Sequence, residues 1–354
     1  MSLAEILADE NKSMKEEVVT IGLPEFDCER IPFTSPRMNW CTYGGIPTGK
    51  LIEFYGEEHG GKTTSALDIV ANFQAIDERK VLYVDVENGV NTAWARKLGV
   101  DVENMIIYRP TLQSAEQLFL FIEKCVKTGE VGLWVIDSIG SLLSAAELDE
   151  KKTYEDKTYA GISASLTRFA KKMEMLGNKY NCTGIGINQE REDLNSQWGG
   201  TKTPGGKAWK YLVNVRMRFS RGQYFDFDGK LLTRSAENPA GNIVLMNMTK
   251  NRTCPPTRRV GSYKINYMEG IDYLRDLVDV AVECGIIDQK GAWFTILDVE
   301  SGEVLKDKLQ GQSKVYNCLE EDEELRARVE ELVNLNIEDL PPVEYEELSE
   351  DEEE

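Results

Sequence analysis

The eight residues from Gly56 to Thr63, GEEHGGKT, constrain this chain more than any other segment, because they match the pattern GxxxxGK[ST]. They lie between a strand-like run, LIEFYG, and a helical run that begins at Thr63. Glycines let backbone N–H groups curl round phosphate oxygens, and the helix that follows presents its positive end to them. We therefore expect a nucleotide-binding loop that contacts ATP through Gly56, Glu57, Glu58, His59, Gly60, Gly61, Lys62, Thr63 and Thr64.

The chemistry of this loop predicts further site residues. Lys62 would reach the β- and γ-phosphates of ATP, and the Thr63 hydroxyl would bind Mg²⁺. Asp137 ends the apolar run LWVID, as a Walker B aspartate does, and would hold the Mg²⁺ shell. Glu87 ends the run VLYVDVE and is a candidate general base, because a carboxylate near the γ-phosphate can accept a proton from the attacking water. The spacing alone leaves open a plain strand-end carboxylate with no ligand.

Strand-like and helical runs alternate through the central part of the chain. Helical stretches of suitable length lie at 114–128 and 162–178. The strand-like runs after the glycine loop are 81–87, 105–110, 132–138, 183–189 and 215–221. Near-continuous apolar strands that alternate with helices predict an α/β fold with a mostly parallel sheet covered on both faces. Residues 24–49 are rich in turns and lack a clear period, so we expect a connection there.

The net charge of −20 argues at first against a nucleic-acid partner, but it is unevenly distributed. Residues 337–354 hold ten acidic and no basic residues, whereas 184–264 holds fourteen Lys/Arg against six Asp/Glu. Because the local field steers a polyanion, a DNA-binding surface stays open. We expect the acidic block to be a solvated, disordered tail. The alternative is a polyanion that competes with DNA for the basic surface.

Cysteine usage and hydropathy exclude several other classes. Seven scattered cysteines with no CxxC pair, and a single histidine, argue against a disulfide framework or a zinc site. No apolar run approaches the roughly 18–20 residues that span a bilayer. The N-terminus lacks the apolar region of a secretory signal. We therefore expect a cytoplasmic protein.

The two ends of the chain lack the regular alternation of strand-like and helical runs seen in the centre. Residues 1–17 predict a short polar helix and 18–23 a small strand. After Gly261, the runs 271–284, 292–298 and 323–335 predict a helix, a strand and a charged helix of a small domain. The predicted organisation is an N-terminal oligomerisation segment (1–33), an ATPase core (34–264), a small α+β domain (265–336) and the acidic tail (337–354).

The sequence resembles RecA recombinases. The segments that carry the resemblance, in family order and at matching intervals, are LIEFYGEEHGGKTT, YVDVENGVNTAWARKLGVD, LWVIDSIGSLL, GIGINQ and EGIDYLRDLVDVAVECGIIDQKGAWF. The match runs from about Ser35 to Gly311. It implies a RecA-like P-loop ATPase core with a small C-terminal domain, using ATP and Mg²⁺. The implied function is DNA-dependent ATP hydrolysis by a helical filament on single-stranded DNA that exchanges strands with duplex DNA in recombination and repair, aided by single-strand-binding and mediator proteins. The short N-terminal helix and divergent surfaces resemble phage-encoded relatives of RecA and UvsX.

The resemblance also implies roles for single residues. Trp94 falls where the family has an adenine-stacking tyrosine, and Asn91 replaces an aspartate that contacts the adenine amine. Gln189 matches the glutamine that senses the γ-phosphate and links it to a DNA loop. Lys250 and Arg252 match two basic residues that reach the ATP of the neighbouring subunit. The implied catalytic residues are Lys62, Glu87, Gln189, Lys250 and Arg252.

Two stretches, 147–160 and 190–207, correspond to the RecA loops that line the filament axis and grip DNA. Leu194 and Trp198 are apolar or aromatic within a polar loop, so either would wedge between bases or stack on them. For Trp198, packing of the loop against the body is the alternative. The remaining DNA contacts are assigned to Arg168, Arg191, Lys202, Gly205, Gly206, Lys207 and Lys210. Further basic candidates are Arg216, Arg218, Arg258 and Arg259.

Two other functional classes stay open from the sequence alone. One is a hexameric helicase with a RecA-type motor, which would carry a sizeable N-terminal domain; about thirty residues precede the core here. The other is a recombinase paralogue or mediator without strand-exchange activity, against which the intact Lys62, Glu87 and Asp137 argue.

Overall fold

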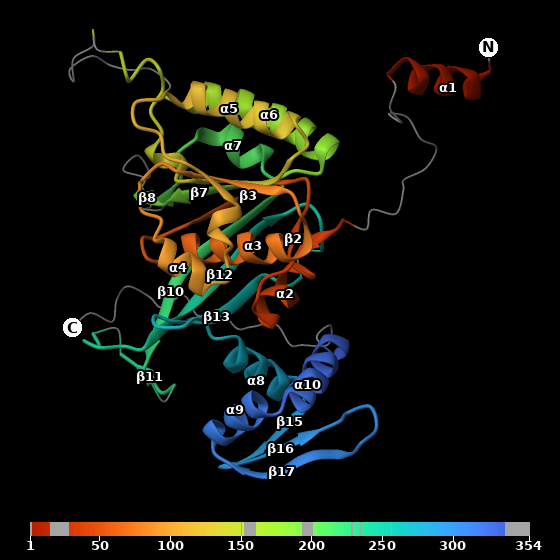
Figure 1. Cartoon of the computed structure of the whole chain (residues 1–354), viewed down its shortest axis with the longest axis vertical. Coiled ribbons are helices and arrows are strands. Elements are labelled where there is room, and N and C mark those ends of the chain that lie inside the picture. The colour runs from red at the N-terminus through yellow and green to blue at the C-terminus, as the bar shows by residue number, and fades with distance from the viewer. Residues whose placement is uncertain are drawn as a thin grey trace.

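The computed structural model of the chain contains one large sheet with helices on both faces (Figure 1). The structure describes residues 2–14, 28–149, 151, 161–192, 201–227, 229–233, 235–255 and 257–336. The expected strand at 18–23 and the acidic tail lie outside the described residues. Within the described part, no helix combines the length and apolarity needed to cross a membrane. Within residues 2–14, the N-terminal helix α1 (Leu3–Met14) buries none of its side chains.

The central sheet joins a parallel half to an antiparallel half. In spatial order its strands are β14 (Gly270–Ile271), β13 (Val260–Asn266), β12 (Gly241–Asn251), β10 (Val215–Phe225), β3 (Leu51–Gly56), β7 (Thr183–Gln189), β6 (Val131–Asp137), β4 (Lys80–Asp85) and β5 (Met105–Tyr108), and β11 (Leu231–Leu232) pairs with β10. From β10 to β5 every neighbouring pair is parallel. The pairs β10–β12, β12–β13 and β13–β14 are antiparallel. The mostly parallel α/β core is confirmed, and the antiparallel extension is an addition to it.

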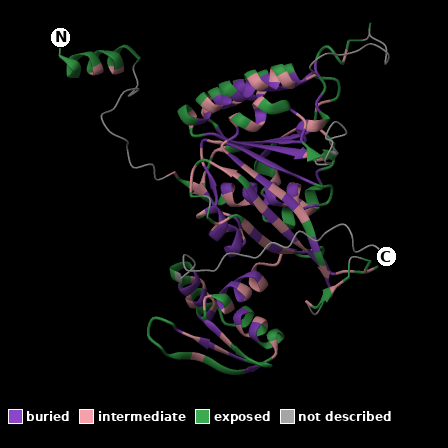
Figure 2. Ribbon diagram, turned by 180° about the vertical axis from the view of Figure 1, so that it is seen from behind, coloured by how far each residue is buried: buried purple, intermediate pink, exposed green. Residues whose placement is uncertain are grey.

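Each face of the sheet packs against its own helical layer, and the strands between them are buried (Figure 2). On one face, Trp134 of β6 packs with α5 (Ala115–Lys127), α6 (Ser163–Tyr180) and α7 (Gly206–Leu212). On the other, Phe54 of β3 shares a core with α3 (Lys62–Ile76) and α4 (Thr92–Lys97). The alternating strands and helices of the sequence therefore form three layers, and the apolar strands are fully enclosed.

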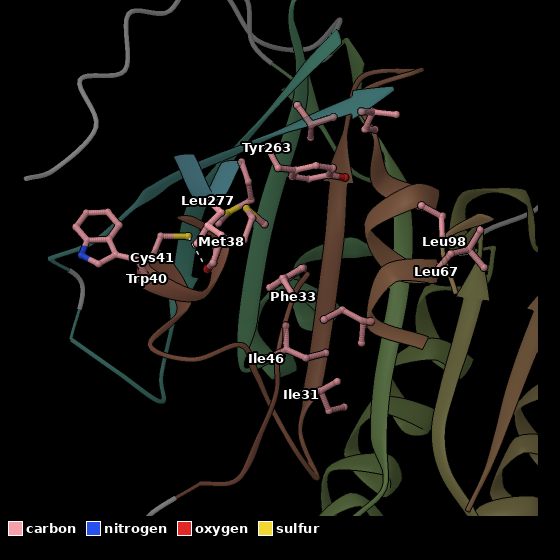
Figure 3. Close-up of a cluster of buried hydrophobic side chains, with 14 of the residues drawn as sticks. Ile31, Phe33, Met38, Trp40, Cys41, Ile46, Leu67, Leu98, Tyr263 and Leu277 are labelled. Carbon is pink, nitrogen blue, oxygen red and sulfur yellow. Dashed lines mark hydrogen bonds between the residues drawn. The ribbon is translucent and has the colours of Figure 1, made fainter. Parts of the chain in front are cut away.

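The segment 24–49, expected to be only a connection, contains regular structure where it is described. It holds β1 (Arg30–Ile31), α2 (Pro36–Thr42) and β2 (Ile46–Pro47). Ser35 caps α2, since its side chain accepts from the Met38 N–H. Met38 and Cys41 of α2 belong to a cluster of buried hydrophobic side chains (Figure 3). An added Cβ at Gly261 of β13 would come within 2.6 Å of the Cys41 sulfur. A seven-residue helix is too short to display a period, which is why the sequence did not reveal it.

A small C-terminal unit follows the large sheet. It contains α8 (Tyr273–Glu283), the antiparallel strands β15 (Ile287–Lys290), β16 (Trp293–Leu297) and β17 (Val304–Gln310), and the helices α9 (Gln312–Glu321) and α10 (Glu323–Asn336). The expected domain boundary at residues 264–265 needs correction, because it cuts through β13, and β14 still belongs to the large sheet. We place the boundary after Ile271 instead.

Four parallel strands set the position of the functional site. β3, β7, β6 and β4 are neighbours in the sheet and end at Gly56, Gln189, Asp137 and Asp85. Because parallel strands share one direction, these ends meet at the same edge. The sheet therefore gathers segments that are far apart in sequence along one line.

Candidate nucleotide and DNA-binding site

The glycine loop joins β3 to α3 in a conformation that requires glycine. Gly56 has φ of 142°, and a Cβ there would meet the Phe219 carbonyl oxygen at 2.0 Å. Gly61 has φ of 92° and begins α3. The Lys62 ammonium donates to the backbone oxygens of Gly56, at 3.2 Å, and Glu57. Burial lowers the pKa of Lys62, and the charge of Asp137 acts against that shift. The loop thus holds a cation beside the N-terminus of a helix, which suits a phosphate.

Thr63 and Asp137 meet beneath the loop. The Thr63 hydroxyl donates to Oδ2 of Asp137 at 2.8 Å, and the buried Tyr83 hydroxyl donates to the same oxygen at 2.9 Å. Burial raises the pKa of Asp137, against the effect of these two hydrogen bonds. A hydroxyl and a carboxylate are the oxygen ligands that Mg²⁺ prefers, so this corner fits the predicted metal. Sequence reasoning missed Tyr83, because its role depends on the neighbouring strand β6.

Glu87 and Gln189 lie together at the same strand edge. Oε1 of Glu87 accepts from Ser138 Oγ at 2.5 Å, Ser141 Oγ at 2.8 Å and Gln189 Nε2 at 3.3 Å. Asp85 supports the Glu87 turn, since its carboxylate accepts from the Gly89 and Val90 N–H groups. The predicted base and the predicted γ-phosphate sensor are therefore in direct contact.

A cavity of about 610 Å³ connects these groups. Its lining includes the glycine loop, Glu87, Asp137 and Gln189, and extends to Trp94, whose indole N–H donates to Thr64 Oγ1 at 3.3 Å. Most of the lining that the sequence did not predict comes from β10, β12, β13 and the turn after β13: Arg221, Asn242, Ile265 and Tyr267. Ser138 and Ile187 complete it. The Tyr267 hydroxyl donates to Asn242 at 2.8 Å. An alternating pattern of apolar residues in β12 and β13 was the available signal.

Asn91 stands outside this lining, so far as the structure describes it. Asn91 caps α4, and its Oδ1 accepts from the N–H groups of Ala93 at 2.9 Å and Trp94 at 3.2 Å. Its oxygen is therefore already bonded to the helix that carries Trp94. The expected contact between Asn91 and an adenine amine stays a prediction.

The comparisons with known proteins agree with this geometry. The model of the RecA N-terminal domain matches residues 3–272, and the model of the RecA C-terminal domain matches 275–338. Protein RecA of Ruminococcus albus is 34% identical over 78% of this chain and 67% of its own length. Protein RecA of Fusobacterium nucleatum is 34% identical over 81% and 71%, and that of Chloroherpeton thalassium 32% over 83% and 78%. The chain belongs to the RecA family. It is therefore of the recombinase class, whose members are DNA-dependent ATPases.

Lys250 and Arg252, expected at the ATP of a neighbouring RecA subunit, have different surroundings in a single chain. The Lys250 ammonium donates to the carbonyl oxygens of Lys210, Tyr211 and Val213, at 2.9, 2.8 and 2.6 Å. These carbonyls lie at the C-terminal end of α7, so Lys250 caps that helix. Burial lowers the pKa of Lys250 to about 8. Arg252 is exposed and lines a surface pocket with Lys50 and Asn214.

The second RecA-type loop is described at both of its ends. β8 (Arg191–Glu192) pairs with β9 (Thr201–Lys202). Leu194 and Trp198 lie outside the described residues, as does most of the loop 147–160. Gly205 is buried and begins α7 with φ of 96°, and an added Cβ would meet Leu166 at 2.8 Å. Its glycine is therefore required for packing. The predicted DNA-binding residues with exposed positions are Arg168, Arg191, Lys202, Gly206 and Lys207, and Lys210 is half-buried.

Two of the further basic candidates have acidic partners inside the protein. Arg216 pairs with the fully buried Glu53 and lies over the Tyr55 ring at 4.2 Å. Arg218 donates to Glu190 at 3.0 Å. These contacts hold the two side chains at the base of the loop. Their expected part in DNA binding stays a prediction. Arg258 instead lies over the rings of Trp40 and Tyr43. The Arg259 carbonyl accepts from the Met248 N–H at 2.6 Å.

Proposed function

We propose that the chain is an ATP-dependent recombinase that polymerises on single-stranded DNA and exchanges strands with homologous duplex DNA. The observation that carries this proposal is the meeting of Lys62, Asp137, Glu87 and Gln189 in one cavity at the edge of the sheet. Such a cavity positions a nucleotide triphosphate, its metal and an attacking water within reach of one carboxylate. RecA-family membership supplies the DNA partner.

In this proposal, Gln189 couples ATP binding to DNA binding. Gln189 ends β7, and the second loop begins at the next residue, Glu190. The C-terminal part of that loop is tied to β7, because Asn188 Nδ2 donates to the Pro204 carbonyl at 2.9 Å. The two ends of the loop are also joined, because Thr201 donates to Glu190 at 2.9 Å. A movement of Gln189 toward a γ-phosphate therefore shifts the base of the loop. ATP binding orders the loop on DNA, and hydrolysis releases it.

The active site is completed between subunits. Arg252 lies away from the cavity of its own chain, in a separate pocket, so it is free to face the nucleotide of the next subunit. A planar guanidinium stabilises the charge of a transferring phosphoryl group. A head-to-tail contact of this kind, repeated without closure, generates a filament.

Identities of 32–34% to bacterial RecA proteins support a divergent member of the family. We propose that it is similar to phage-encoded relatives of RecA and UvsX. In this proposal it acts in the cytoplasm, with single-strand-binding and mediator proteins as partners. Arg191, Lys207 and Lys210 contact phosphates, while Leu194 and Trp198 contact bases.

The decisive experiment is strand exchange between circular single-stranded DNA and linear homologous duplex, with ATP and Mg²⁺. We expect joint molecules, ATP hydrolysis stimulated by single-stranded DNA, and open filaments in electron micrographs. Lys62→Ala is the matched control and should lose all three, because the ammonium that reaches the phosphates is gone. Equal affinity for an oligonucleotide with and without nucleotide, at matched salt, would contradict the proposal, and closed rings would indicate a helicase.

A further inference from the structure

The carboxylate of Glu87 is held on one side only. Among the described residues, the hydrogen bonds donated to Glu87 all end at Oε1, and they come from Ser138, Ser141 and Gln189. The serine hydroxyls are closest, at 2.5 and 2.8 Å, and Gln189 lies at 3.3 Å. The two serine hydroxyls also contact each other at 3.1 Å. Glu87 lines the cavity, so its second oxygen, Oε2, is left for a ligand.

The spacing of the two serines explains how both reach one oxygen. Ser138 precedes, and Ser141 ends, a short 3₁₀ helix, Ile139–Ser141. Side chains three residues apart eclipse one another in a 3₁₀ helix, because it has three residues per turn. The Ser141 N–H donates to the Ser138 carbonyl at 3.3 Å, which closes that turn. The two hydroxyls therefore form one donor pair aimed at Glu87.

The segment that follows Ser141 is anchored to the start of α5. The Ala115 N–H donates to the Leu143 carbonyl at 2.8 Å, and the Ala145 N–H donates to the Glu116 carboxylate at 2.9 Å. Ser144 is engaged separately, since its hydroxyl donates to Glu147 at 2.7 Å. Ser141 is thus fixed between β6 and α5, whereas Gln189 continues into the second loop. The serine pair can hold Glu87 while Gln189 moves.

We propose that Ser141 is a positioning residue for ATP hydrolysis, which binds Oε1 of Glu87 and turns Oε2 toward the attacking water. This inference rests on the proposed function. In the step it serves, the water oxygen forms a bond to the γ-phosphorus while the bond to the β–γ bridging oxygen breaks. ADP leaves with that electron pair, and Glu87 takes the proton of the water. Ser141 touches neither water nor nucleotide and acts only through Glu87.

The test compares Ser141→Ala, Ser141→Thr and the matched control Ser144→Ala, in full-length protein at saturating single-stranded DNA. We expect S141A to lower kcat about tenfold, the order of one lost hydrogen bond to a charged group. The KM for ATP and the affinity for a non-hydrolysable ATP analogue should stay unchanged. S141T keeps the hydroxyl and should restore most of kcat, and S144A should match the unaltered protein.

A double variant separates positioning from a general structural effect. Because Ser141 acts through Glu87, S141A should cost nothing further in an E87Q background. An unchanged kcat in S141A, an equal loss in S144A, or a further tenfold loss in S141A/E87Q would overturn the inference. Those outcomes differ from failure of the proposed function, in which the unaltered protein itself shows no DNA-stimulated hydrolysis.

Discussion

The nucleotide cavity and the base of the second loop differ in how their charged side chains are used. In the cavity, Lys62, Asp137 and Glu87 converge on one space, although they come from three separate segments. At the loop, the cations divide: Arg216 and Arg218 are paired with acidic groups inside the protein, while Lys207 stays exposed. The ends of the parallel strands bring the three cavity residues together in space. The role of a basic side chain at the loop depends instead on which residues of other strands lie beside it. Motif spacing therefore predicts the cavity better than it predicts the DNA surface.

The largest effect is expected at Arg252, which would complete the cavity of a second subunit. Arg252→Met should lower DNA-stimulated ATP turnover about 10³-fold, because an arginine that completes a phosphoryl-transfer site in trans contributes that much. Mixing R252M with K62A should restore part of the turnover, since each site can then take its glycine loop from one protein and Arg252 from the other. Mixtures that stay as inactive as the separate variants would show that the cavity works within one chain.

The next effect separates the two kinds of loop cation. Arg216→Met leaves the buried Glu53 without its partner and should lower the free energy of unfolding by about 3 kcal/mol, measured by denaturant titration. Lys207→Met should change it by less than about 0.5 kcal/mol. K207M should instead weaken DNA binding and reduce the slope of log affinity against log salt by about 1. If R216M were as stable as the unaltered protein, the distinction would fail.

A smaller effect is expected at Lys250, whose ammonium caps α7. Lys250→Met should cost about 1–2 kcal/mol of unfolding free energy, because three C-terminal carbonyls lose a charged donor. Lys250→Arg, which keeps charge and donors, is the control and should lose less. A K250M protein of full stability would assign Lys250 to the neighbouring subunit alone, as the resemblance to RecA implies.

The smallest effect is expected at Tyr83, which contacts the expected Mg²⁺ ligand Asp137. Tyr83→Phe removes one hydrogen bond to Asp137 and keeps the ring in its buried place. The free energy of Mg²⁺ binding should therefore weaken by about 1 kcal/mol. We expect the Mg²⁺ concentration needed for half-maximal nucleotide binding to rise about fivefold. A Mg²⁺ titration with a fluorescent ATP analogue measures it. Nucleotide affinity at saturating Mg²⁺ should be unchanged. An unaltered Mg²⁺ requirement would limit Tyr83 to a packing role.

The sequence predicted those parts that depend on local order along the chain. The glycine loop, Asp137 and the mostly parallel sheet follow from short motifs and alternating elements. The sequence did not identify Tyr83, Ser141 and Tyr267, because each contacts a residue of another strand or turn and belongs to no motif. The helix α2 escaped because it is short, and the domain boundary was misplaced because β12 and β13 were not recognised.

The position of β13 and β14 has a practical consequence for dissecting the protein. Tyr267 of the cavity lies in the turn between these two strands, only a few residues before α8 opens the C-terminal unit. A fragment that stops at residue 264 would keep every ATPase motif and yet lose one side of its nucleotide pocket. Met268, in the same turn, is 65% exposed, so we expect it to be accessible to limited proteolysis. The shortest fragment that retains a whole pocket therefore ends at or after Ile271.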